Sequence, residues 1–402
     1  MQARTEKAKA HNSTVKTFVE KRTPKANKAQ TRAVELELND IDCVLKWNPD
    51  KITSFYDWDN TGNWKENGYT EYTYNADGEV ASETEYYYDE YEGKYITSRK
   101  YVYTYDPQVP GLVIKREAYN WDGTQLVPSE YETEEWKITR NSAGLIVSAV
   151  ESYGGNYFNK MEIEYGKDNM PVKITLSDED GIDGVYTDMV WNRFNGKTFL
   201  LFDDMDDLID MIPGENSIKS CKYSDEDLEE TLNVTFTDKG FTYVYKEVEK
   251  YDDDADTSEE TATIEYTDEN GSFKVESVEK SWENENPSDV ETETLKGEVV
   301  FEKYGLCTYM KSIETSQNYT DTKEDKYTVV YDETTGLPAQ YVGRDRKYVF
   351  TNGATGAVDS ILAPDANAPV EYFDLNGRRV EDPSNGLYIR RQGSKASKII
   401  VK

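Results

Sequence analysis

The residues of this chain that could do chemistry are carboxylates, because it contains 79 Asp and Glu but a single histidine, His11. A pair of facing carboxylates can hydrolyse a glycosidic bond, yet so many acids give no basis for choosing a pair. The lone histidine argues against histidine-based acid–base catalysis and His-rich metal sites. No GxSxG, HExxH or P-loop motif occurs. The sequence therefore predicts no catalytic residue and no cofactor.

The candidate for a metal site is an acidic stretch in which the carboxylates of Asp252, Asp254 and Asp256 alternate. This alternation resembles the start of a calcium-binding loop. Such a loop needs glycine at its sixth position and glutamate at its twelfth. The sixth position here is Thr257, and no glutamate stands at the twelfth. We expect a solvated hairpin tip at this stretch rather than a metal site.

Aromatic residues are the candidates for ligand binding. The set is Trp58, Trp64, Tyr101, Tyr103, Tyr105, Trp121 and Trp136. Tyr and Trp combine a flat apolar body with a polar tip, so a platform built from them can stack on sugar rings. Cross-strand aromatic pairs also stabilise any β-sheet, so a purely structural role is the alternative.

A recurring unit predicts the elements that position these residues. It is clearest in 72–80, Tyr-Thr-Tyr-Asn-Ala-Asp-Gly-Glu-Val, where two alternating aromatics precede a turn closed by glycine and an apolar residue. The corresponding glycines are Gly78, Gly111, Gly144, Gly240, Gly271, Gly305 and Gly336. Their spacings are 33, 33, 96, 31, 34 and 31 residues, which indicates a repeat of about 32 residues holding one outgoing and one returning strand.

Other glycines, at 93, 123, 154–155 and 181–184, fall between the turns of the repeat and fit the opposite hairpin ends. The fold class predicted is therefore all-β, an antiparallel β-meander. Neither alternating face of 95–105 is strongly apolar, which favours a broad sheet that is wetted on one side.

One segment breaks the β pattern. Residues 199–212 carry apolar side chains three and four positions apart and end at Pro213-Gly214, the pattern of an amphipathic helix. We expect this helix to join two β-domains. The predicted division is a flexible basic lead at 1–32, β-meander domains at 33–198 and 221–360, a connector at 199–220, and a linker with a small β tail at 361–402.

The charge is unevenly distributed. Residues 1–32 carry nine Lys or Arg against two Glu, and residues 371–402 carry seven against four acids. The net charge of −33 is therefore the sum of +7 in residues 1–32, +3 in residues 371–402 and −43 in the body of the chain between them. Such a body repels nucleic acid and anionic lipid, so neither is an expected partner. High negative charge also keeps a protein soluble, which is the simpler interpretation.

The cysteines and the apolar runs restrict the cellular context. Cys43, Cys221 and Cys307 form no CxxC pair, so zinc ribbons and redox motifs are not expected. One disulfide with a spare thiol and three buried thiols both remain open. No apolar run is long enough for a transmembrane segment. We interpret the start of the chain as a mature sequence whose signal peptide has been removed.

Two stretches resemble known families. The unit at 72–80 resembles the YD repeats of Rhs-type and teneurin-type shells, a resemblance that implies strand–turn–strand geometry only. The tail resembles the C-terminal sorting tails of Bacteroidetes type IX secretion, with Asp-x-x-Gly-Arg-x-Val, Gly-x-Tyr and Lys-x-x-Val elements in order. The matching residues are Asp374, Gly377, Arg378, Val380, Gly386, Tyr388 and Lys398. This resemblance implies the secretion machinery as a partner and export to the outer surface or the medium.

The function we predict is that of a non-enzymatic binding protein, secreted or displayed at the surface, whose ligand is a glycan or a host protein. Two alternatives remain: a secreted polysaccharide hydrolase that uses paired carboxylates, and a structural spacer or shell.

Overall fold

The computed structural model describes residues 34–352 and 370–401, apart from 39–40, 58, 110, 155–156, 198–204, 213, 215, 252–253, 284–289, 374–378, 381–385 and 393–394. The chain divides into two compact units, Met1–Thr351 and Asn352–Lys402. The predicted flexible lead at 1–32 lies outside the described residues.

The first unit is built almost entirely of strands. Its main sheet contains β3 Lys51–Tyr56, β4 Lys65–Tyr74, β5 Val80–Asp89, β6 Lys94–Tyr105, β7 Val113–Trp121, β8 Leu126–Arg140, β9 Ile146–Tyr153, β10 Tyr157–Tyr165, β11 Pro171–Ser177, β12 Ile182–Arg193, β13 Ser217–Ser224, β14 Leu228–Phe236, β15 Gly240–Tyr251, β16 Asp254–Tyr266, β17 Phe273–Glu283, β18 Glu291–Phe301, β19 Cys307–Thr315, β20 Thr320–Lys326, β21 Thr328–Tyr331, β22 Pro338–Val342 and β23 Arg346–Thr351. These strands confirm the predicted all-β fold.

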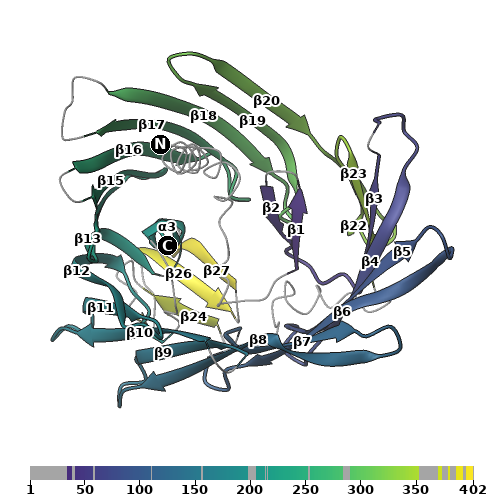
Figure 1. Ribbon diagram of the computed structural model, residues 1–402, viewed down its shortest axis with the longest axis horizontal. Coiled ribbons are helices and arrows are strands. Elements are labelled where there is room, and N and C mark those ends of the chain that lie inside the picture. The colour runs from purple at the N-terminus through teal and green to yellow at the C-terminus, as the bar shows by residue number, and fades with distance from the viewer. Residues whose placement is uncertain are drawn as a thin grey trace. The chain divides into compact units, whose positions relative to one another are not determined.

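The 21 strands form an antiparallel meander in which neighbours in sequence are neighbours in the sheet (Figure 1). The last strand, β23, pairs with the first, β3, over six residue pairs and closes the sheet into a barrel. β20 and β21 are one run of chain interrupted at Tyr327: β20 pairs with β19, and β21 pairs with β22. The covalent connection through Tyr327 therefore links the part of the sheet that ends at β20 to the part that begins at β21.

The predicted turn recurs with the same hydrogen bonds. In the β4–β5 hairpin the Asn75 side chain accepts from the backbone N–H groups of Asp77 and Glu79 at 3.0 and 2.9 Å. Asn141 caps the β8–β9 turn in the same way, and Glu302 caps the β18–β19 turn with its longer side chain. Asn and Asp favour such turns because their side chains replace missing backbone partners. The repeat in the sequence is therefore a repeat of hairpins.

The apolar residue that follows each of these turns is buried. Examples are Val80, Leu112, Ile146, Phe273, Leu306 and Leu337. Because equivalent turns of a meander lie at the same edge of the sheet, these side chains gather towards one end of the barrel. The turn motif thus fixes both the chain reversal and the position of the core.

Two further elements of this unit lie within the ring of strands: the hairpin of β1 Glu35–Leu38 and β2 Ile41–Val44, and the helix α3 Met205–Asp210 (Figure 1). Cys43 on β2 lies 3.7 Å from the Tyr341 hydroxyl on β22 and accepts from the Cys307 N–H at 3.3 Å. In α3, Met205 contacts Cys221 on β13, sulfur to sulfur, at 3.5 Å. The sheet face that carries Cys221, Cys307 and Tyr341 is therefore the inner face.

The helix predicted at 199–212 is present over Met205–Asp210 in the described part, with Met205, Leu208 and Ile209 buried. The strands on either side of it, β12 and β13, pair with each other, with Tyr186 opposite Tyr223. The helix is therefore an insertion between neighbouring strands of one sheet, whereas we expected a connector between two β-domains. The pairing of β12 with β13 joins residues far apart in the sequence. The local spacing of apolar residues that predicts the helix therefore gives no information about this pairing.

All three cysteines are buried free thiols, so the alternative with a disulfide is not found. Burial raises the pKa of the Cys221 and Cys307 thiols well above the ordinary range. Among the helices described, none is long and apolar enough to cross a membrane.

The second unit is a four-stranded antiparallel sheet of β24 Val370–Phe373, β25 Arg379–Val380, β26 Gly386–Gln392 and β27 Lys395–Val401, in the order β25-β24-β26-β27. It is the small β tail that the sequence predicts. Of the sorting residues, Val380 lies on β25, Gly386 and Tyr388 on β26, and Lys398 on β27. Asp374, Gly377 and Arg378 lie outside the described residues.

Candidate functional site

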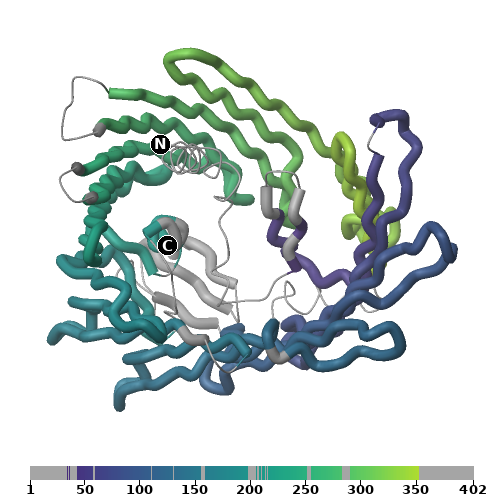
Figure 2. The backbone as a smooth tube through the Cα atoms, in the orientation of Figure 1, coloured from purple at the N-terminus to yellow at the C-terminus, as the bar shows by residue number. Residues whose placement is uncertain are grey.

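The outer face of the barrel carries a cluster of four tyrosines on the neighbouring strands β4, β5 and β6. Figure 2 traces the backbone of these strands. We call Tyr69, Tyr86, Tyr88 and Tyr95 the outer tyrosine cluster. The Tyr69 and Tyr86 rings are stacked, with centroids 4.4 Å apart. The Tyr95 ring meets Tyr69 edge-on at 4.7 Å and Tyr88 at 5.3 Å. Such pairs prefer offset-stacked or edge-to-face geometry, so the four rings form one continuous aromatic surface.

Strand register builds this surface. Tyr69 on β4 lies opposite Tyr86 on β5, and Tyr88 on β5 lies opposite Tyr95 on β6. Successive side chains of a strand point to opposite faces, so Tyr86 and Tyr88 share the face that Tyr87 does not. Gly68 allows the close approach of β4 to β5, because a Cβ there would stand 2.1 Å from the Tyr86 carbonyl oxygen.

Charged groups border the cluster. The Lys51 ammonium lies 3.2 Å from the centroid of the Tyr69 ring, a cation–π contact. The Tyr95 hydroxyl donates to the Glu66 carboxylate. Burial, the hydrogen bond to Glu66 and the Glu66 charge raise the pKa of Tyr95 to about 12. The Tyr95 hydroxyl is therefore protonated at neutral pH and remains a hydrogen-bond donor.

The cluster is partly accessible to a ligand, since Tyr69, Tyr86 and Tyr88 are half-buried and Tyr95 is exposed. Tyr95 is 39% exposed, and Tyr91, at the tip of the hairpin that joins β5 to β6, is fully exposed. Tyr side chains supply large amphipathic contact area at low entropic cost, which is why they are enriched in binding surfaces. The arrangement can hold a flat or ring-shaped ligand and bond its hydroxyl groups.

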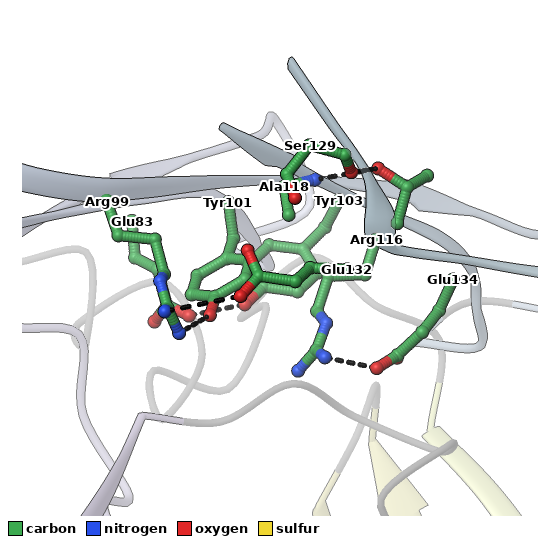
Figure 3. A network of polar contacts seen from close by, with 10 residues as sticks. Glu83, Arg99, Tyr101, Tyr103, Arg116, Ala118, Ser129, Glu132 and Glu134 are labelled. Carbon is green, nitrogen blue, oxygen red and sulfur yellow. Dashed lines mark hydrogen bonds and ion pairs between the residues drawn. The ribbon is translucent and has the colours of Figure 1, made fainter. Parts of the chain in front are cut away.

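The inner face of β5–β8 carries a polar network instead (Figure 3). Arg99 donates to the Tyr101 hydroxyl at 2.7 Å and pairs with Glu132 at 3.3 Å. Arg116 pairs with Glu134, and its guanidinium lies 5.0 Å from the centroid of the Tyr101 ring. On the neighbouring strands the Tyr103 hydroxyl donates to Glu83.

A bulge in β8 brings Glu132 into this network. Arg116 pairs with Glu134 but Ala118 pairs with Ser129, so β8 contains extra residues at this point. The Thr133 hydroxyl stabilises the bulge, because it accepts from the Ala118 N–H at 3.2 Å and donates to the Ser129 carbonyl at 2.8 Å. Bulges often re-aim side chains next to functional sites.

The carboxylates of this network are placed for ion pairing. The hydrogen bond from Asn120, with the nearby Arg99 and Arg116 charges, outweighs desolvation and lowers the pKa of Glu132. A general acid needs the opposite shift, since it must hold its proton near neutral pH. The geometry of the inner network therefore favours a structural role over glycoside hydrolysis.

The six described members of the predicted aromatic platform do not share one surface. Tyr101, Tyr103 and Tyr105 lie on the inner face with Trp136, and Tyr101 and Tyr103 are buried. Trp121 lies on the opposite face at the end of β7 and is 36% exposed. Trp64 lies beside Lys347, 5.3 Å from its ammonium. Trp58 lies outside the described residues.

The outer tyrosine cluster is not among the residues predicted from the sequence. Its signal was the run Tyr86-Tyr87-Tyr88 followed by Tyr95 across a glycine turn. The pairing of β5 with β4 adds Tyr69, and no local pattern reveals that partner.

The acidic stretch considered for a metal begins at the tip between β15 and β16. Asp252 lies outside the described residues, and Asp254 and Asp256 pair with Tyr251 and Glu249 in the ladder. Across the part of the chain that is described, no group of three or more Asp, Glu, His or Cys is placed to hold a metal ion.

Comparison with known proteins found a similar solved structure and no match in sequence. No protein-family model matches the chain, and no curated protein matches it. A search of solved structures found a porin-like protein from Bacteroides uniformis, at 9% identity, covering 75% of this chain and 96% of that one, with a TM-score of 0.26.

Proposed function

We propose that this protein is a non-enzymatic binding protein that acts outside the cell and binds polysaccharide through the outer tyrosine cluster. The supporting observation is the continuous aromatic surface on β4–β6, with Lys51 and Glu66 at its border. The apolar face of a sugar ring can pack on such a surface while the border groups bond its hydroxyls.

The second support is the chemistry of the inner face. The carboxylates that gather on β5–β8 are engaged by Arg and Tyr partners. Ion-paired carboxylates bind and orient, whereas hydrolysis needs one carboxyl that keeps its proton. Binding without turnover therefore accounts for more of the structure than hydrolysis does.

The extracellular location is part of the proposal and draws on the tail. Its sequence resembles type IX sorting tails, and its described strands form a small separate sheet. The body of −43 also suits a protein that is freely solvated.

The test is affinity electrophoresis of the full chain through gels that contain plant, host or microbial polysaccharides. We expect one class to retard the protein, and Tyr95→Ala to weaken that binding by at least about tenfold, or about 1.4 kcal/mol. Tyr95→Phe keeps the ring and should keep most of the affinity. Tyr131→Ala removes an exposed tyrosine outside the cluster and is the matched control.

Three results would contradict the proposal. Equal retardation of wild type and Tyr95→Ala would place the binding surface elsewhere. Retardation with loss of polymer viscosity would identify a hydrolase. If no gel retards the protein, the polysaccharide proposal fails and a protein ligand becomes the hypothesis to test.

A further inference from the structure

A second aromatic group lies on the outer face beside the outer tyrosine cluster. It contains Phe55 on β3 and Trp64, which comes just before β4. The Lys347 ammonium of β23 lies 4.3 Å from the centroid of the Phe55 ring and 5.3 Å from that of the Trp64 ring. Both rings are half-buried, so part of each is open to solvent. We call Phe55, Trp64 and Lys347 the second aromatic group.

Strand register places this group on the same face as the tyrosines. Lys51, whose ammonium lies over the Tyr69 ring, and Phe55 are four residues apart on β3 and therefore point to the same side. Lys347 lies directly opposite Phe55 in the ladder between β23 and β3. The outer face therefore carries aromatic rings on every strand from β3 to β6.

Glu66 connects the two groups. It lies directly opposite Phe55 in the ladder between β3 and β4, and its carboxylate accepts the hydrogen bond of the Tyr95 hydroxyl. The register shifts here because Asn67 is an extra residue of β4. This bulge turns Glu66 to the face that also carries Tyr69, three residues further along the strand.

The second aromatic group offers both kinds of contact that a sugar makes with a protein. The Trp64 ring supplies a flat apolar surface on which the face of a sugar ring can pack. The Lys347 ammonium beside it has three donors, which can bond the hydroxyls of that sugar. The outer tyrosine cluster combines rings with the Lys51 ammonium in the same way.

The two groups together cross five neighbouring strands, β23 and β3 to β6. Because neighbouring strands lie about 4.8 Å apart, the surface from Lys347 to Tyr95 is about 19 Å long. The rings of an extended polysaccharide follow one another at close to the strand spacing. A polysaccharide that crosses the strands therefore places about four rings on this surface.

We propose that the second aromatic group extends the binding site, and that the ligand is an uncharged linear polysaccharide held along about four of its rings rather than by its end. This inference rests on the proposed function, because it takes the outer tyrosine cluster as the first part of the site. The charge of −43 on the body of the chain repels polyanions. An uncharged polysaccharide avoids that repulsion, which is why we choose it over an acidic one.

The test is calorimetric titration of the full chain with cello-, malto-, manno- and xylo-oligosaccharides, from disaccharide to hexasaccharide, and with polygalacturonate as the acidic probe. In one neutral series the affinity should rise from the disaccharide to the tetrasaccharide and then level off. Trp64→Ala should weaken tetrasaccharide binding about tenfold, or about 1.4 kcal/mol, and disaccharide binding by less than about twofold. Lys347→Met keeps the apolar stem and should also weaken tetrasaccharide binding. Trp282→Ala, at a half-buried tryptophan on β17, is the matched control.

The variants separate this inference from the proposed function. If Tyr95→Ala weakens tetrasaccharide binding while Trp64→Ala and Lys347→Met do not, the outer tyrosine cluster binds sugar and the extension is wrong. If no neutral series binds, or if Tyr95→Ala leaves all binding unchanged, the proposed function fails and the extension fails with it. An affinity that does not depend on chain length, or tighter binding of polygalacturonate than of any neutral series, would overturn the extension alone.

Discussion

At the residue scale, tyrosine is the residue type that best explains the molecule, and its hydroxyl has a repeated structural use. Tyr74, Tyr105 and Tyr165 are the last residues of β4, β6 and β10, just before the turns to β5, β7 and β11. Their hydroxyls donate to the carbonyls of Pro49, Val80 and Ile146 at 2.6, 2.7 and 2.6 Å. The bonds of Tyr105 and Tyr165 each tie one hairpin to the adjacent one, and the bond of Tyr74 ties its hairpin to the segment before β3. Phenylalanine could make none of these bonds.

We predict that Tyr105→Phe lowers the free energy of unfolding by about 1 kcal/mol, because it removes one hydrogen bond and leaves the ring in place. Urea unfolding followed by circular dichroism measures the change. Tyr131→Phe, at a position 87% exposed, should stay within about 0.5 kcal/mol of wild type. Equal effects of the two substitutions would contradict a structural use of the Tyr105 hydroxyl.

A second residue-scale prediction concerns the ion pair of Asp106 and Arg140, which lie 2.8 Å apart with side chains 9% and 10% exposed. Burial alone would raise the pKa of Asp106, but the hydrogen bonds from Arg140 and from the Gln108 backbone outweigh it and lower this pKa. The depressed pKa means that the pair stabilises the fold above the ordinary aspartate pKa of about 3.9. This contribution is lost as the pH falls through the lower, folded-state value.

Asp106→Asn should therefore destabilise the protein at neutral pH by roughly 3 kcal/mol, because it leaves Arg140 buried without its anion. The difference from wild type in urea midpoint should shrink as the pH falls below the ordinary aspartate pKa of about 3.9 and through the lower, folded-state value. A difference that is the same at every pH would show that the charge of Asp106 is unimportant.

At the element scale, the β1–β2 hairpin depends on one close approach to the barrel. Gly305, in the turn between β18 and β19, has a φ of +85°, in the left-handed region that glycine adopts readily. A Cβ at this position would stand 2.0 Å from the Val44 carbonyl oxygen at the end of β2. The Lys46 N–H donates to the Tyr304 carbonyl at 2.9 Å in the same place.

We predict that Gly305→Ala displaces this hairpin and lowers the unfolding free energy by about 3 kcal/mol or more, since it adds a backbone clash to the left-handed penalty. Gly336→Ala is the matched control, because Gly336 has φ of +69° but open space around its Cβ position. The control should cost only about 1–2 kcal/mol. Equal losses in the two variants would show that the hairpin does not rest on Gly305.

At the scale of the whole molecule, the repeat unit was enough to predict the meander. Turn residues such as Asn75 and Asn141 act locally, and the glycine spacing carries that information along the chain. The closure was not predictable, because β23 pairs with β3 across nearly the whole unit and nothing local marks that pairing. The helical segment was found, but its insertion between paired strands was not.

The candidate site was harder to predict for a related reason. In a sheet with one apolar and one polar face, alternation tells inside from outside. Here the inner face is itself rich in Tyr, Glu and Arg, so Tyr101 and Tyr103 look like exposed residues in the sequence although they are buried. The outer tyrosine cluster could be recognised only once the registers of β4, β5 and β6 were known.

The most direct test of the central claim is nitration of tyrosines by tetranitromethane, with and without the polysaccharide that retards the protein most, followed by peptide mass spectrometry. The account predicts that saturating polysaccharide slows nitration of Tyr86, Tyr88 and Tyr95. Nitration of Tyr131 and Tyr319, exposed outside the cluster, should continue at its original rate. Protection of Tyr131 or Tyr319 with none at Tyr95 would contradict the claim that the outer tyrosine cluster is the binding surface.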